Sequence, residues 1–105
     1  MVLLFPSLAL GETMDDLVET KGLYYKKFTN IPFTGNVTGK KQGMFINGKE
    51  HGLWIEYHDN GRVASKGTYK DGKNDGPWVW SHDNGQLMSK RTFKDGNLDG
   101  PYVSY

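Results

Sequence analysis

Cysteine is absent from the 105 residues, which excludes disulfides, iron–sulfur clusters and thiolate zinc sites. An excess of one charge is also missing, since thirteen Lys and Arg are balanced by twelve Asp and Glu for a formal net charge of +1. This interspersed balance lacks the basic face that a nucleic-acid partner requires. No serine-nucleophile motif, phosphate-binding loop, dinucleotide fingerprint or paired-carboxylate setting occurs. The sequence therefore gives no support for an enzyme, a cofactor or nucleic-acid binding.

A long apolar run is lacking too. The longest, VLLFPSLAL at residues 2–10, is far shorter than the ~20 residues of a membrane-spanning helix. Its length suits a signal peptide, and Ala9 and Gly11 supply small residues for cleavage before Glu12. Because no Lys or Arg precedes the run, an ordinary buried segment is the alternative. We expect residues 1–11 to be a signal-peptide remnant of a periplasmic or secreted protein; without such a signal the protein is cytoplasmic.

A 24-residue internal repeat is the strongest pattern that is present. Residues 43–66 and 67–90 align without gaps and are identical at 11 of 24 positions, and a partial third copy covers residues 91–105. Fourteen Gly and a 13% aromatic content accompany the repeat, as is typical of short strands joined by tight turns. We therefore divide the chain into the remnant at 1–11, a lead-in segment at 12–42 and repeats at 43–105.

Two kinds of turn signal alternate within the repeat. Asn60-Gly61, and Asn84-Gly85 one repeat later, form the preferred pair for a two-residue type I′ hairpin loop. The segment DGKNDG at 71–76, with counterparts at 47–52 and 95–100, predicts a longer turn. Strand-like stretches separate the turns. The predicted fold is all-β, an elongated antiparallel meander of hairpins in a single sheet.

The turn geometry predicts a register. A two-residue loop at 60–61 fixes three cross-strand pairs: Asp59–Arg62, His58–Val63 and Trp54–Gly67. A longer turn of matching geometry adds three aromatic pairs: Phe45–Trp54, Tyr69–Trp78 and Phe93–Tyr102. Because side chains alternate between faces, one face should carry the aromatic ladder and the other should be wetter and carry lysines.

The lead-in segment allows two readings. Met14, Leu17 and Val18 have helical spacing, with Thr13 and Asp16 as a capping box, but the same residues suit a strand of an extra hairpin. Residues 23–28 and 33–39 read as strands, and Pro32 predicts a turn or a sheet edge between them.

The repeat units resemble MORN repeats, and more closely the bacterial MORN-repeat variant, a hairpin unit built on G-x-W-x-x-Y-x-x-N-G-x-x-x-x-x-G-x-Y-x-x-G. The positions that carry the resemblance and should be structural are Gly52, Trp54, Tyr57, Asn60, Gly61, Gly67, Tyr69, Gly72, Gly76, Trp78, Asn84, Gly85, Phe93, Gly96, Gly100 and Tyr102. Ser81 replaces the usual Tyr and Arg91 the usual Gly, which puts the packing of the last strand in doubt. Residues 22–39 resemble the lead-in of exported bacterial proteins with such repeats.

The resemblance implies a non-enzymatic interaction or scaffold module with an unidentified protein partner. Two alternatives come with it: an antitoxin-like inhibitor of a toxin partner, which export would fit poorly, and a module that binds an anionic membrane surface. The last strand, near residues 102–105, also suggests self-association by strand addition.

The repeated HDNG segments, at 58–61 and 82–85, raise the question of catalytic or metal-binding dyads. In the predicted meander His58 and His82 lie ~10 Å apart on one face, without an evident third ligand. Their neighbours Asp59 and Asp83 point to the other face. The segment DGNLDG at 95–100 resembles half of a calcium loop but lacks its final Glu. We interpret all of these as hairpin structure and predict no metal site.

Lysines and a tryptophan supply the remaining candidates for an interaction surface. Lys66 and Lys90 occupy equivalent positions on the wetter face, with Lys70 and Lys94 further along the strands. A periodic lysine row suits an anionic lipid or polysaccharide, or simply a solvated sheet face. Trp80 extends the aromatic row, which is either a binding platform for sugar or peptide or the packing of a thin sheet.

Asn60→Ala combined with Gly61→Ala is expected to weaken folding far more than His58→Gln or His82→Gln, because the first pair reverses the chain. Urea unfolding compares the three variants. Equal destabilisation, or loss of a bound metal in the histidine variants, would contradict the structural interpretation.

Overall fold

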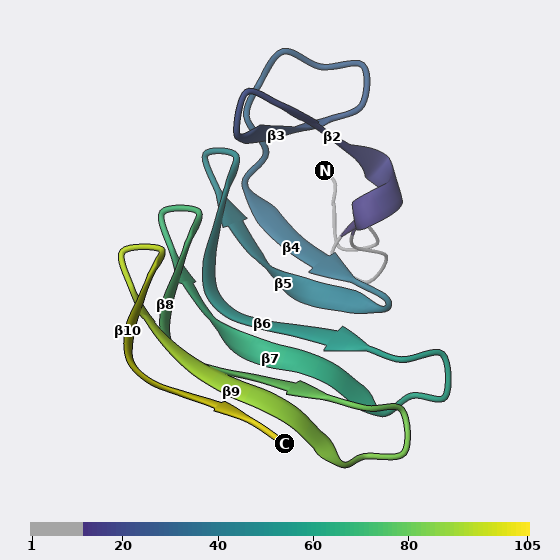
Figure 1. Cartoon of the computed structure of the whole chain (residues 1–105). Coiled ribbons are helices and arrows are strands. Elements are labelled where there is room, and N and C mark those ends of the chain that lie inside the picture. The colour runs from purple at the N-terminus through teal and green to yellow at the C-terminus, as the bar shows by residue number, and fades with distance from the viewer. Residues whose placement is uncertain (1–11) are drawn as a thin grey trace.

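Eight strands form the main sheet of the computed structural model, which describes residues 12–105 (Figure 1). Their order in the sheet is β1 (Glu12–Thr13), β4 (Gly35–Thr38), β5 (Lys41–Ile46), β6 (Lys49–Tyr57), β7 (Val63–Lys70), β8 (Lys73–Ser81), β9 (Leu87–Lys94) and β10 (Asn97–Ser104). From β4 to β10 every neighbour is antiparallel and adjacent in sequence, which confirms the predicted meander. The molecule measures 52 × 30 × 21 Å, so it is elongated as expected. The expected signal-peptide remnant at 1–11 lies outside the described residues.

The lead-in segment adds features that the single-sheet prediction lacked. A short 3-10 helix, η1 (Met14–Asp16), begins with the predicted capping box, in which the Thr13 N–H donates to Asp16 Oδ2 at 2.8 Å. The chain then leaves the helical conformation, and β2 (Leu17–Thr20) pairs with β3 (Leu23–Lys26) in a separate two-stranded sheet. The predicted helix start and the predicted strand of an extra hairpin are therefore both confirmed in part. β1 is parallel to β4, and Tyr25 and Pro32 form an isolated antiparallel bridge.

The two kinds of turn are exchanged relative to the prediction. Within the repeats, the tight two-residue loops are Asn47-Gly48, Asp71-Gly72 and Asp95-Gly96, where both residues of each pair have positive φ as a type I′ turn requires. The residues after each loop continue as strand, so the predicted six-residue turns are wrong. Successive tight loops are also linked: the Gly72 N–H donates to Glu50 O at 2.9 Å, and the Gly96 N–H donates to Asn74 O at 3.0 Å.

The Asn-Gly pairs at 60–61 and 84–85 lie in wider loops, which corrects the predicted type I′ turns there. The Gly61 N–H donates to His58 O at 2.9 Å and the His58 N–H donates to Arg62 O at 2.7 Å, which closes a three-residue loop. Gly61 has a φ of 88°, whereas Asn60 is not among the described residues with positive φ. This is a turn followed by a left-handed glycine, the commonest three-residue hairpin loop. His58 therefore lies opposite Arg62 rather than Val63, and Asp59 is within the loop.

A one-residue bulge restores the predicted register beyond the loop. Tyr57 pairs with Val63, but Glu56 pairs with Ser65, so Ala64 is the extra residue. From there Trp54 pairs with Gly67, as predicted. The same irregularity occurs one repeat later between Trp80 and Ser81.

Strands β6 and β8 bend sharply (Figure 1), and Trp54 and Trp78 in these strands each cross the preceding strand. Lys66 pairs with Val79 and Thr68 with Asp75, so the stretch 76–78 faces the single residue Gly67. Because of these two extra residues Tyr69 pairs with Asn74 and not with Trp78, which corrects the predicted register. The Trp78 ring lies directly on Gly67, where an added Cβ would overlap it, and Trp54 lies on Gly43 in the same way. Trp78 Nε1 also donates to Thr68 O at 2.9 Å.

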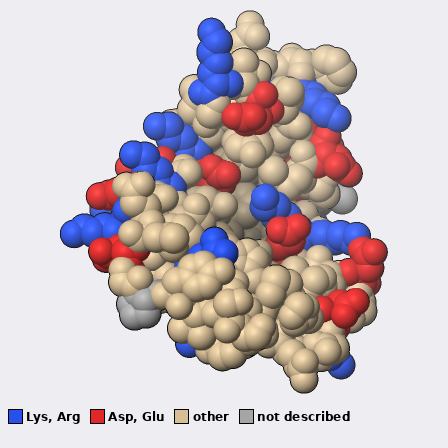
Figure 2. Space-filling view, in the orientation of Figure 1, with Lys and Arg blue, Asp and Glu red and all other residues tan. Residues whose placement is uncertain are grey.

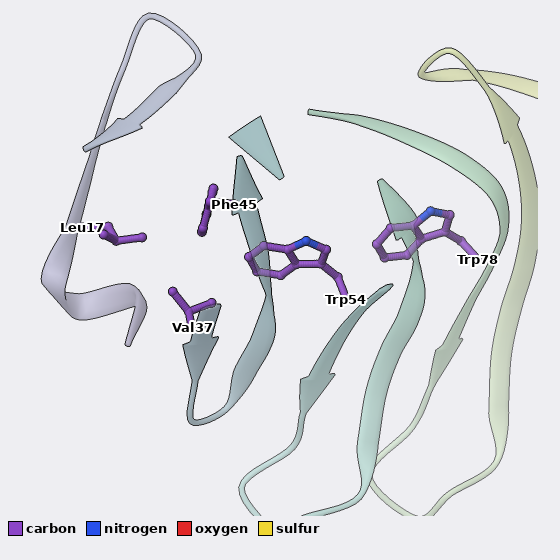
Figure 3. Packing of buried hydrophobic residues seen from close by; sticks show 5 residues of the cluster. All are labelled: Leu17, Val37, Phe45, Trp54 and Trp78. Atoms are coloured by element: carbon purple, nitrogen blue, oxygen red, sulfur yellow. The ribbon is translucent and has the colours of Figure 1, made fainter. Parts of the chain in front are cut away.

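Aromatic rings form a continuous row on the face inside this bend, called the inner face here (Figure 3). Edge-to-face contacts join Phe45 to Trp54, Trp54 to Tyr69 and Tyr69 to Trp78, with centroids 5.0, 5.9 and 5.0 Å apart. Two of the predicted aromatic contacts, Phe45–Trp54 and Tyr69–Trp78, thus exist diagonally rather than as direct pairs. Phe45 is 0% exposed and Trp54 is 2% exposed, so this row is the core of the protein.

The two ends of the aromatic row differ. At the start, Leu17, Tyr24, Phe33 and Val37 from the lead-in segment pack against Phe45, so β2 and β3 cover the row there (Figure 3). At the other end, Arg91 occupies the position of Gly43 and Gly67, and it pairs with Tyr102. Phe93 pairs with Leu98, so the predicted Phe93–Tyr102 pair is wrong. Tyr102 stacks on the Arg91 guanidinium at 4.4 Å and remains 50% exposed.

Charged side chains of both signs are interspersed over the face seen in Figure 2, in line with the near-neutral net charge. Within residues 12–105, no helix has the length and apolar character needed to cross a membrane.

Gly67→Ala is expected to destabilise the protein by about 1–3 kcal/mol, because the new methyl group must displace the Trp78 ring from a packed position. Urea unfolding followed by circular dichroism measures the change. As a control, the same substitution in a Trp78→Leu background should cost much less, since the smaller side chain leaves room. A neutral Gly67→Ala, or an equal cost in both backgrounds, would show that the contact is not limiting.

Candidate functional site

The inner face is hollowed beside the aromatic row, between β5 and β8. One cavity of about 140 Å³ is lined by nine residues, among them Lys41, Tyr69 and Asn74. A second, of about 370 Å³, extends toward His58 and Asp59. Both are lined by Glu56, Ser65 and Trp80, so the two cavities adjoin at these residues, and we call them together the inner groove.

Strand pairing positions the centre of the inner groove. Glu56 on β6 pairs with Ser65 on β7, and Ser65 pairs with Trp80 on β8, so the three side chains form a row across the sheet. Lys41 on β5 extends this row because it pairs with Glu56. Trp80 is half-buried: its ring stacks on Trp78 at 5.9 Å, and one part of it lines the groove. An apolar ring thus lies next to a hydroxyl, a carboxylate and an ammonium group.

Lys41 and Glu56, the charged residues at the centre of the groove, form no ion pair with the described residues, whereas Lys40 and Asp59 at its end pair with each other. The ion pairs among residues 12–105 are Lys26–Glu12 and Lys40–Asp59, so neither Lys41 nor Glu56 takes part in one. Arg91, which lies beside Trp80 with its guanidinium 5.4 Å from that ring, likewise has no carboxylate within ion-pair distance. Its Nε is buried without a hydrogen-bond partner among the described atoms. The inner face therefore offers charged groups of both signs to a ligand.

The HDNG segments connect one hairpin loop to the next. His58 Nε2–H donates to Ser81 O at 2.8 Å, and Asn60 Nδ2 donates to Asp83 O at 2.7 Å. Arg62 Nη1 bonds Asn84 O in the same row of contacts. The asparagines also fix their own loops, since Asn60 Oδ1 and Asn84 Oδ1 each accept an N–H two residues on, both at 2.9 Å. The side chains of His58 and Asn60 thereby hold adjacent loops together, whereas the Asn84 side chain, among the described residues, bonds only within its own loop.

Residues 50–71 and 74–95 match the MORN repeat variant family. These two segments are MORN-variant repeats. Their starting points are 24 residues apart, which is the period found in the sequence. MORN repeats are non-catalytic modules of protein interaction or membrane binding. The comparison finds no match among curated proteins or solved structures.

The residues of the family pattern fall into two groups in the structure. Turns and bends contain Gly52, Asn60, Gly61, Gly72, Gly76, Asn84, Gly85, Gly96 and Gly100. Contacts along the inner face involve Trp54, Gly67, Tyr69, Trp78 and Phe93, with Tyr102 on Arg91 beyond them. Tyr57 bridges to the lead-in end, because its N–H donates to Lys40 O at 2.7 Å.

The predicted lysine row is on the outer face of the MORN-variant repeats, away from the inner groove. Lys66 and Lys90 flank Val79 on neighbouring strands, and both are exposed. Lys70 and Lys94 precede the tight loops at Asp71-Gly72 and Asp95-Gly96 and are exposed as well. Of the predicted surface residues only Trp80 lines the inner groove.

No group of three or more potential metal-binding side chains occurs in the part of the chain that the structure describes. In the half calcium motif at 95–100, Asp95 and Gly96 form a tight loop while Asp99 is in β10. The carboxylates of this segment are thus divided between a turn and a strand.

Sequence reasoning missed the inner groove itself. The alternation of faces already put Glu56, Ser65 and Trp80 on one side, which was the available signal. The hollow depends on the two extra residues at each bend, and the local signal for them is a single glycine within the strand, Gly52 or Gly76. Arg91 was noted only as a departure from the family pattern.

Two tyrosines on the inner face have raised pKa values. Burial raises the pKa of the Tyr69 hydroxyl, and the negative charge of Glu50 adds to the rise. The pKa of Tyr24 is raised by the same two causes, with a further contribution from Glu19. Both hydroxyls therefore hold their protons more tightly in the folded than in the unfolded state.

Stability is expected to fall as the pH rises above about 10, the pKa of an unfolded tyrosine. A folded-state pKa above that value stabilises the fold fully at lower pH, and this contribution is lost as the pH passes through the raised value. The free energy of urea unfolding near pH 8 and near pH 11 measures the effect. Tyr69→Phe should flatten the pH dependence, with Tyr105→Phe at an exposed position as the matched control. An unchanged slope in Tyr69→Phe would contradict the assignment.

Proposed function

We propose that the protein is a non-enzymatic scaffold module that binds an extended segment of a protein partner in its inner groove. The observation that carries this proposal is that two cavities adjoin at Glu56, Ser65 and Trp80. A half-buried tryptophan beside charges without ion-pair partners suits a ligand with both apolar and charged side chains.

The groove's shape and chemistry define the ligand further. Its two cavities extend from Tyr69 and Asn74 to His58 and Asp59, so a ligand filling both is elongated rather than compact. An apolar side chain would pack on Trp80. A basic side chain would then be within reach of Glu56, and an acidic one within reach of Lys41, because these two residues follow Trp80 across the sheet.

Export to the periplasm or cell surface is part of the proposal, supported by the apolar run at 2–10 and the small residues Ala9 and Gly11 before Glu12. Mass spectrometry of the protein recovered from its native cells tests this part: a chain that begins near Glu12 supports export. Recovery from the cytoplasm with Met1 intact, together with a toxin as the bound partner, would instead establish the antitoxin-like role.

Selection of peptides from a displayed random library against the full chain tests the groove. Peptides that combine an aromatic or aliphatic residue with charged residues should be enriched. Ser65→Arg, which fills the centre of the groove, should weaken their binding at least tenfold, and so should Trp80→Ala. Thr68→Arg is the matched control, because it adds the same side chain to the outer face of the same strand.

Peptides that bind Ser65→Arg as well as the unmodified chain would place the binding site elsewhere. Circular dichroism and urea unfolding of each variant separate loss of binding from loss of folding. This check matters for Trp80→Ala, since the Trp80 ring also contacts Phe93 at 6.4 Å.

A further inference from the structure

Phe28, in the loop between β3 and β4, is the least protected large side chain among the described residues. Its relative exposure is 103%, so it makes almost no packing contact. Its backbone is also left-handed, with a φ of 68°. A bulky residue in this region is a genuine outlier and costs of order 1–3 kcal/mol, which nothing around the ring offsets.

Hydrogen bonds fix the turn that presents Phe28. The Thr29 N–H and the Thr29 hydroxyl both donate to Lys26 O, at 3.1 and 2.8 Å. The Lys27 N–H donates to Asp16 O at 2.9 Å, which ties the turn to η1. The phenylalanine is therefore held out from the surface by a defined turn.

Further apolar and basic side chains accompany Phe28. Ile31, in the same loop, is 74% exposed. Lys21 and Lys27 are exposed, whereas Lys26 pairs with Glu12 at 3.1 Å. The nearby carboxylates of Glu19 and Asp16 accept backbone N–H groups from Gly22 and Thr13. Figure 2 shows this end of the molecule, at the top, as an uncharged tip with basic side chains on both sides and acidic side chains below it.

We propose that this tip, defined as Phe28 and Ile31 with Lys21 and Lys27, inserts into the interface of an anionic lipid membrane. A protruding ring with cations beside it suits a lipid interface, which accepts an apolar side chain of any shape and attracts the lysines through its surface charge. Two side chains cover far less than the ~800 Å² per partner of a stable protein interface. The proposal thus favours a lipid surface over a protein partner.

The tip and the inner groove are separate surfaces. The tip belongs to the lead-in loop between β3 and β4, whereas the groove lies over β5 to β8 (Figure 1). The lipid contact does not depend on the proposed function, and failure of either leaves the other standing.

Sedimentation of the full chain with lipid vesicles tests the proposal. The protein should bind vesicles that contain phosphatidylserine more tightly than vesicles of phosphatidylcholine alone, and added salt should reduce the difference. Lys21→Gln with Lys27→Gln should weaken binding to the anionic vesicles by about 25-fold, since each lysine near such a surface is worth about fivefold. Phe28→Ser with Ile31→Ser should weaken binding to both kinds of vesicle by at least tenfold.

Leu53→Ser with Leu98→Ser is the matched control. It removes two exposed apolar side chains away from the lead-in loop, which are 52% and 55% exposed, and it should leave vesicle binding unchanged.

Phe28→Gly separates a binding role from a structural one. Glycine accepts the left-handed backbone without strain, so this variant should be as stable as the unmodified chain or more stable, yet bind vesicles as poorly as the serine variant. The proposal is overturned if the unmodified chain binds neither vesicle, if the tip variants bind as well as the unmodified chain, or if Phe28→Gly is markedly less stable. Concentration-dependent self-association that Phe28→Ser abolishes, without vesicle binding, would assign the tip to a second copy of the chain.

Discussion

The placement of a tryptophan ring directly on a glycine of the preceding strand is the contact on which the rest of this fold depends. Two such contacts exist, Trp54 on Gly43 and Trp78 on Gly67. Each requires a glycine in one strand and, in the next strand, two extra residues opposite that glycine. Those extra residues bend the sheet, and Gly52 and Gly76 accept the left-handed backbone that the bend requires. A thin sheet can thereby enclose a row of aromatic rings along its inner face, which no flat sheet of this width would do.

Because the core lies on one face of the sheet, it needs a structure at each end of the aromatic row that shields the last ring from solvent. At the first end the lead-in segment supplies it, because Leu17, Tyr24 and Phe33 shield Phe45 completely from solvent. At the other end Arg91 prevents a third ring-on-glycine contact, and Tyr102 stacks on the guanidinium instead. The exposure of the ring that crosses the preceding strand increases accordingly, from 2% at Trp54 and 5% at Trp78 to 50% at Tyr102. Packing quality thus declines along the array, and the less tightly packed end is where Trp80 and Arg91 remain open to other contacts.

The sequence was sufficient for the parts of this structure that depend on period and alternation. The 24-residue repeat, the antiparallel meander, the aromatic face and the Trp54–Gly67 pair could all be predicted from it. The turn types could not, because Asn-Gly suits both a two-residue type I′ loop and a three-residue loop that ends in a left-handed glycine. The choice between these two loop types depends on whether a bulge at Ala64 can restore the strand register. Whether the bulge forms depends in turn on packing across several strands. The inner groove could not be predicted for the same reason, because its shape follows from bulges. The exposure of Phe28 could not be predicted either, because its loop lies outside the repeats and has no second copy with which to compare it.

Comparison of the repeats with one another separates residues that serve the fold from residues that are free for function. Several positions identical in both full repeats have a structural cause: the glycines under the rings, the tryptophans above them, and the His-Asp-Asn-Gly loops that bond to each other. The inner groove is centred on a position that differs, because Glu56 in the first repeat is replaced by Trp80 in the second, 24 residues on. Neither residue is required by the ring-on-glycine contact, and Ser65 between them keeps the surface open. An acid and an aromatic ring at equivalent sites give the groove two chemically different walls, so the extended ligand proposed for it would meet a different residue type at each end.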